Sequence, residues 1–248
     1  MTDLAWHVLW VALATDLATG LGALPFAFVR RISDRSHGIL AALAAGMMIS
    51  ASVFALADKA LRTGELWLVI AGLLAGAAFF AWSARLLQRT EWRIRHLSAA
   101  ESRQSVLIII MMFVHSIPEG IAIGVGYATG ELEFGLLLAS AIAVHNVPEG
   151  LAVSLPLRVK GVSVPACAGY AILTSVPQPI AAVPSFLLVS VFQPLLAPAL
   201  GFAGGAMIFL AIAELLPDSL ARCTKEETAW ALMAGLVGML WLTAALGV

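Results

Sequence analysis

Long apolar runs alternate with short polar connections along the whole chain, and each run is long enough to cross a bilayer as a helix. None of the runs alternates in polarity, as the strands of a membrane barrel would. The expected fold is therefore all-α, a polytopic membrane helix bundle that forms a single transmembrane domain over 1–248. We predict eight transmembrane helices, at about 4–28, 37–60, 65–87, 104–128, 132–156, 162–190, 195–216 and 228–247.

Composition agrees with this pattern. Hydrophobic residues make up 61% of the chain and charged residues 12%, and the mean hydropathy is +0.96, whereas soluble domains carry about a quarter charged residues. Eight spans leave no room for an extramembrane domain. The first apolar run lacks a cationic leader and a cleavage site, so we expect it to be a structural span and not a signal peptide.

The basic residues predict the orientation. All Lys and Arg except Lys59 and Arg62 fall on the connections after the first, third, fifth and seventh runs. By the positive-inside rule these connections are cytoplasmic, so both termini are expected outside a cell membrane that the chain crosses many times. The basic residues are spread over four loops without interleaved aromatic residues, which argues against a nucleic-acid partner.

Two segments in the fourth and fifth runs share one pattern: Val-His-Ser-Ile-Pro-Glu-Gly at 114–120 and Val-His-Asn-Val-Pro-Glu-Gly at 144–150. A charged group at the bilayer centre costs about 2.5–3.5 kcal/mol on insertion scales, so a repeated His/Glu pattern there implies a compensating ligand. Residues at i and i+4 share a helix face, and imidazole nitrogen with carboxylate oxygen is a ligand set of divalent metals. We predict metal ligands at His115, Glu119, His145 and Glu149.

Pro118 and Pro148 follow the two histidines at the same spacing and are expected to disrupt each helix beside the site. The two spans run antiparallel, so both histidines should lie at similar depth, with Glu119 on the outer side and Glu149 on the inner side. We therefore expect a column of ligands along the membrane normal, which is the shape of a transport path.

These segments, together with Thr19–Pro25, Gly46–Met48, Gly204–Met207 and Glu214–Pro217, resemble the bacterial members of the ZIP (Zrt/Irt-like protein) family of divalent-metal transporters. The resemblance implies eight helices with inverted internal symmetry, a site between the fourth and fifth spans, a homodimer, and elevator-like movement of metal into the cytoplasm. Zinc is the first expected substrate, with iron, manganese, cobalt and cadmium also compatible with the ligands. The metal is cargo, and no resident cofactor is expected.

The chain departs from the family at two positions. Ser116 stands where the family has Asn, and Gln178 where the sixth span commonly supplies Glu. With Asn146, the residues of a second, adjacent metal site would then all be neutral, so we expect one strong site and one weak or absent site. Met48 is at a position where the family has a thioether ligand, although methionine in an apolar helix also serves as core packing.

Several polar residues keep two interpretations. Asp16 is either a pathway acid or a partner of a neighbouring hydroxyl group, and Glu214 is either an exit ligand or a surface carboxylate. His37 and His96, at the inner ends, are surface histidines or acceptors of released metal. The alternatives to a transporter are an intramembrane metalloenzyme, for which the His-Glu-x-x-His motif and catalytic residues are missing, and a metal receptor that does not transport.

Overall fold

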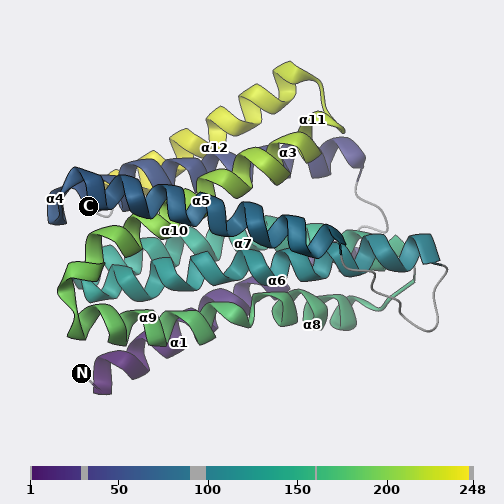
Figure 1. The fold of residues 1–248 in the computed structure, drawn as a ribbon. Coiled ribbons are helices and arrows are strands. Elements are labelled where there is room, and N and C mark those ends of the chain that lie inside the picture. The colour runs from purple at the N-terminus through teal and green to yellow at the C-terminus, as the bar shows by residue number, and fades with distance from the viewer. Residues whose placement is uncertain (1, 29–32, 90–98, 160, 246–248) are drawn as a thin grey trace.

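The computed structural model describes residues 2–28, 33–89, 99–159 and 161–245, and the statements below concern these residues (Figure 1). Helices account for the regular structure of the described residues, which contain no strand, so the all-α prediction is confirmed. The α-helices are α1 Thr2–Leu21, α2 Pro25–Phe28, α3 Asp34–Ser50, α4 Asp58–Thr63, α5 Leu66–Arg89, α6 Ala99–Ala128, α7 Leu132–Val159, α8 Val164–Ser175, α9 Pro177–Val191, α10 Leu196–Leu210, α11 Leu216–Leu220 and α12 Lys225–Ala245.

Within the described residues, seven helical stretches are long and apolar enough to cross a membrane. They are Thr2–Phe28, Asp34–Thr63, Leu66–Leu86, Leu132–Leu155, Val164–Val191, Gln193–Leu220 and Lys225–Ala245. Helix α6 occupies the fourth apolar run of the sequence. Figure 1 marks the N and C ends at the same end of the molecule.

The helices pack as two bundles. The first bundle contains α1, α6, α7, α8 and α9, and the second contains α3, α5, α10 and α12. In Figure 1, α12 and α3 lie along one edge and α1, α8 and α9 along the opposite edge, while α6 and α7 lie between them. The bundles meet where α6 contacts α10 and α7 contacts α3.

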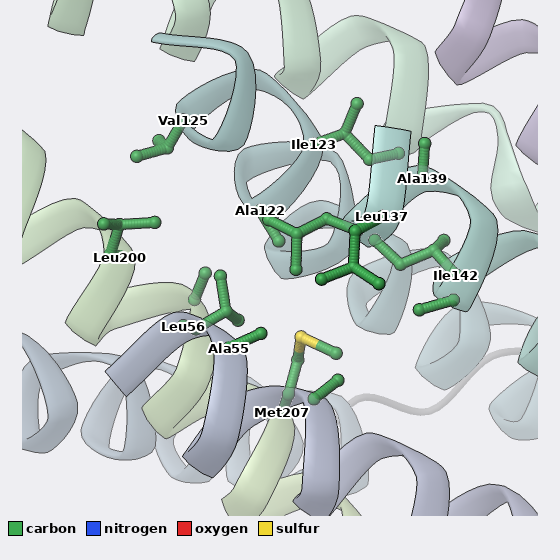
Figure 2. Packing of buried hydrophobic residues seen from close by; sticks show 14 of the residues in the cluster. Ala55, Leu56, Ala122, Ile123, Val125, Leu137, Ala139, Ile142, Leu200 and Met207 are labelled. Carbon is green, nitrogen blue, oxygen red and sulfur yellow. The ribbon is translucent and has the colours of Figure 1, made fainter. Parts of the chain in front are cut away.

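An apolar layer separates the bundles at the end of the molecule that holds both termini (Figure 2). Leu56, just after α3, and Leu200 on α10 lie on one side of this layer, and Ala122 on α6 and Leu137 on α7 lie on the other. All four side chains are fully buried. Lys59 also forms an ion pair with Glu131 at this end. These contacts close this side of the interface between the bundles.

Glycine allows the first bundle to pack closely. A Cβ added to Gly150 on α7 would lie 1.7 Å from the Thr19 carbonyl oxygen on α1, and one added to Gly120 on α6 would lie 2.3 Å from the Gln178 carbonyl oxygen on α9. Without hydrophobic driving force between helices in lipid, such close backbone contact contributes directly to association. The glycine that ends each His/Glu motif therefore holds its helix against a neighbour.

We expect Gly150→Ala to destabilise the protein by about 3 kcal/mol or more, because the clash is with backbone that cannot move independently. Gly238→Ala is the matched control, because a Cβ there meets nothing within 4 Å. The control should leave stability unchanged or raise it by up to about 1 kcal/mol. Thermal unfolding of both variants in detergent checks this, and equal melting of the two would contradict the packing described for α1 and α7.

The helices are interrupted at places other than those expected. Helices α6 and α7 continue through Pro118 and Pro148, so the prediction of a break beside each histidine is wrong. A proline removes one backbone donor, and in a packed membrane helix neighbouring bonds keep the helix continuous. Irregular turns occur instead at the π-helical segments η1 (Ala51–Ala57) and η3 (Ala211–Leu215), at the 3₁₀ segment η2 (Gln193–Leu195), and between α8 and α9.

Candidate metal centre

Helices α6 and α7 each present one His/Glu pair to the other. The Nε2 atom of His115 lies 3.0 Å from Glu119 Oε1 and 2.6 Å from Glu149 Oε1. The Nε2 atom of His145 lies 2.6 Å from Glu119 Oε1 and 3.6 Å from Glu149 Oε1. All four side chains are buried, with at most 3% of any residue exposed. One ligand atom from each residue lies within 4.8 Å of the others.

This arrangement is a compact cluster and not the expected column. Side chains on an α-helix lean toward the N-terminus of their own helix. Because α6 and α7 are antiparallel, Glu119 leans back toward the level of His115 and Glu149 leans back toward the level of His145. The two carboxylates therefore converge on the level of the two imidazoles, where a single ion can contact all four residues.

A helix carbonyl orients one of the imidazoles. The Nδ1 atom of His145 lies 3.2 Å from the Ala141 carbonyl oxygen, one turn earlier on α7. A carbonyl oxygen only accepts, so Nδ1–H donates this bond, and the Nε2 atom is left facing the carboxylates. Histidine ligands in metal sites commonly donate their second N–H in this way, which fixes the orientation of the ring.

The Glu149 carboxylate contacts the two imidazoles. Its Oε1 atom forms a buried ion pair with His115 Nε2 at 2.6 Å, although this contact lacks regular hydrogen-bond geometry. Among the described residues, neither oxygen of Glu149 receives a hydrogen bond. A buried carboxylate that accepts no hydrogen bond raises the free energy of the folded state. Carboxylate oxygens only accept, so a bound cation would stabilise them.

A closed amide network surrounds the other oxygen of Glu119. Gln178 Nε2 donates to Glu119 Oε2, and Gln178 Oε1 accepts from Thr15 Oγ1 at 3.0 Å and from Asn146 Nδ2 at 3.2 Å. Asn146 Nδ2 also donates to the Thr15 carbonyl oxygen at 2.8 Å. The structure thus brings Asn146 and Gln178 beside the cluster. It adds Thr15, which sequence reasoning missed although a polar residue next to Asp16 in an apolar run was a visible signal.

Ser116 lies apart from this network. Its hydroxyl donates to the Met112 carbonyl oxygen at 3.0 Å and to the Thr174 carbonyl oxygen on α8 at 3.2 Å. The single hydroxyl proton is therefore shared between two backbone carbonyl oxygens, and the side chain links α6 to α8. Ser116 is buried together with the cluster, with 1% of the residue exposed.

The two methionines of α3 have different surroundings. Met48 is fully buried in the apolar core. Met47 lines an enclosed cavity of about 10 Å³ with His145, and Met207 of α10 lines the same cavity. Two thioethers, those of Met47 and Met207, therefore share a cavity with the predicted ligand His145, and sequence reasoning singled out neither as a candidate ligand.

The remaining candidate residues lie outside the four-residue cluster. Asp16 is buried, and its Oδ1 atom has no hydrogen-bond partner among the described residues. Glu214 is exposed on η3. His37, at the start of α3, is buried and lines a second cavity that also reaches Glu149. His96 lies outside the described residues.

The fold and the cluster together define a class: a polytopic helical membrane protein with a buried His/Glu cluster that has the composition of a divalent-metal site. A family model described as ZIP Zinc transporter matches residues 88–243. The zinc transporter GufA of Myxococcus xanthus is 32% identical over 247 residues, which are 95% of this chain and 97% of GufA. The chain belongs to the ZIP family.

Two further relatives agree with this assignment. The zinc transporter ZIPB of Bordetella bronchiseptica is 34% identical over 250 residues, which cover 93% of this chain and 78% of ZIPB. A longer protein from Arabidopsis thaliana is 40% identical over 229 residues, which are 92% of this chain and 37% of the plant protein. The family and the apolar helices make this chain a multi-pass membrane protein whose partners include divalent metal ions and the bilayer.

Proposed function

We propose that this chain is a carrier that moves divalent transition-metal ions, zinc first among them, across the membrane into the cytoplasm. The observation that carries the proposal is the buried cluster of two imidazoles and two carboxylates, in which, among the described residues, Glu149 forms ion pairs but accepts no hydrogen bond. Two carboxylates balance the charge of one dication in low dielectric, so the occupied site is close to neutral.

The distances suit an ion of the size of zinc. Zinc binds histidine nitrogen and carboxylate oxygen at about 2.0–2.2 Å, and tetrahedral ligands then lie about 3.4 Å from one another. The nitrogen–oxygen separations in the cluster run from 2.6 to 3.6 Å, so a small opening of the site accommodates the ion. Each Nε2 atom must give up its proton before it binds metal, so protons compete with the ion for the site.

We propose His115, Glu119, His145 and Glu149 as the ligands of one principal ion, with Met47 or Met48 as the thioether neighbour. Asn146, Gln178 and Ser116 are proposed as a weak or absent second site. The hydrogen bonds of Gln178 and Asn146 support this, because both amides are already engaged with Glu119, Thr15 and each other. Neutral groups with satisfied hydrogen bonds gain little from a second dication.

We infer eight transmembrane helices with inverted internal symmetry, with α6 as the eighth. The helix contacts support a symmetry that relates α1 to α8 and α9, α3 to α10, α5 to α12, and α6 to α7. The contact of α1 with α7 then corresponds to that of α8 and α9 with α6, and the contact of α3 with α12 corresponds to that of α10 with α5. The glycine contacts follow the same relation, because Gly46 and Gly235 bring α3 to α12 while Gly76 and Gly205 bring α5 to α10. The π-helical segments lie in the two corresponding spans.

The division into two bundles supports an elevator-like movement of the first bundle, which holds all four proposed ligands. The second bundle leaves large aromatic side chains exposed, including Trp67 and Trp82 on α5 and Trp230 and Trp241 on α12. We propose that such a face contacts lipid or the second copy of a homodimer. The distribution of basic residues supports placing both termini outside the cytoplasm.

The test is metal uptake by the purified chain in liposomes that hold a metal-sensitive dye. The panel consists of zinc, iron(II), manganese, cobalt and cadmium, with protein-free liposomes as the control. A time-dependent signal that saturates with external zinc is expected. Bound metal without any flux would instead favour the metal receptor, and would contradict the carrier.

A further inference from the structure

A second cavity leads away from the metal cluster toward the end of the molecule opposite the termini. It has a volume of about 40 Å³ and is lined by Glu149 at one end and by His37 and Asp218 at the other. Ala41 and Ala44 of α3 line its wall. From His37 to Ala44 the helix rises about 10 Å, so the cavity joins the cluster to a distinct group of side chains.

His37 reaches the cavity as a buried imidazole that lacks a full set of partners. The residue is 8% exposed, and among the described residues its Nδ1 atom has no hydrogen bond. Its Nε2 atom lies 3.6 Å from Asp218 Oδ2, which is too long for a hydrogen bond. That separation is close to the roughly 3.4 Å between two ligands of one zinc ion.

Arg222 adds a positive charge to this group. Its Nε atom donates to Asp218 Oδ1 at 3.0 Å, and its Nη1 atom donates to Asp34 Oδ1 at 3.3 Å. The Oδ2 atom of Asp218 is left on the side of His37. A dication held between His37 and Asp218 would therefore experience repulsion from Arg222, which weakens binding.

We propose that His37 and Asp218 form a further metal site, called the inner site below, that is separate from the cluster. It receives a divalent ion from Glu149 and releases it at the cytoplasmic face. The inference rests on the proposed function, because it assumes that the cluster loads metal. Two protein ligands leave the remaining positions of the ion to water, and the nearby guanidinium lowers affinity. Both features suit a site from which an ion must leave.

The experiment uses cadmium, which scatters anomalously, on crystals of the full chain grown with limiting and with excess cadmium. We expect a strong peak at the cluster at both concentrations, and a weaker peak between His37 and Asp218 only at excess cadmium. His37→Gln should remove the weaker peak alone. His7→Gln is the matched control, because His7 is an exposed imidazole near the start of α1, and the N-terminal end of α1 lies at the opposite end of the molecule from α11 (Figure 1).

Arg222→Gln should strengthen cadmium binding at the inner site, whereas His37→Gln should abolish it. Removing the guanidinium should tighten cadmium binding at the inner site about tenfold, since one unit of nearby repulsion is lost. The same variant should slow cadmium delivery into liposomes, because release is then retarded. Glu226→Gln, an exposed charge change in the same region, should alter neither measurement.

The outcomes separate the two proposals. A filled cluster with no peak at His37 and Asp218 at excess cadmium would overturn the inner site and leave the proposed function intact. An empty cluster would contradict the proposed function itself. An inner peak that persists in His37→Gln, or that does not strengthen in Arg222→Gln, would also overturn this assignment.

Discussion

Replacing Glu149 with glutamine should reduce metal uptake to background, with a smaller loss of stability in the metal-free protein than the same change at Glu119. The carboxylate supplies one of the two negative charges that balance the ion, so its loss leaves an occupied site with an uncompensated charge in low dielectric. In the metal-free protein Glu149 forms ion pairs with His115 and His145 but accepts no hydrogen bond, so the substitution breaks fewer interactions than one at Glu119 does. Uptake into liposomes and thermal unfolding in the presence of a chelator measure the two effects.

Glu119→Gln provides the contrast. The Glu119 carboxylate accepts hydrogen bonds from His115, His145 and Gln178, so its substitution places an amide donor against existing donors. We expect loss of uptake together with a destabilisation of about 3–5 kcal/mol, the usual cost of removing one partner of a buried ion pair. Glu133→Gln, an exposed carboxylate, should change neither property. Normal flux in Glu149→Gln would refute the ligand assignment.

The second large effect is expected for Gln178→Glu, which should raise the number of bound zinc ions from one to two per chain. In the wild type, the Gln178 amide donates to Glu119 Oε2. A glutamate there would place two carboxylates against each other, and such a pair must share a proton or bind a cation. The added ion should also slow release, so uptake should fall although more metal is bound. Elemental analysis and anomalous scattering give the stoichiometry.

Gln193→Glu is the control for the added charge, because Gln193 is exposed on η2 far along the chain from the cluster. It should leave the stoichiometry at one. Two equally occupied ions in the wild type at low zinc would show that neutral amides suffice for a second site, and the expectation of a single principal ion would then be wrong.

The sequence by itself determined the helical character of the chain, its class and its family. An apolar run in lipid must satisfy its own backbone, and a helix does so within the run, so the all-α fold followed from local pattern alone. The repeated His/Glu spacing placed two pairs of polar groups on two helix faces at similar depth. Those statements depend only on distances along one helix.

Only the tertiary structure decided how these faces meet. The four side chains form a cluster instead of a column because two antiparallel helices lean their side chains toward a common level. The donors around Glu119 come from residues as distant in sequence as Gln178, and Thr15 joins them through a contact with α9. Neighbouring helices also decide whether a proline breaks a helix, which methionines share a cavity with His145, and where a cavity leads from Glu149. Packing between distant segments leaves no periodic signal in the sequence.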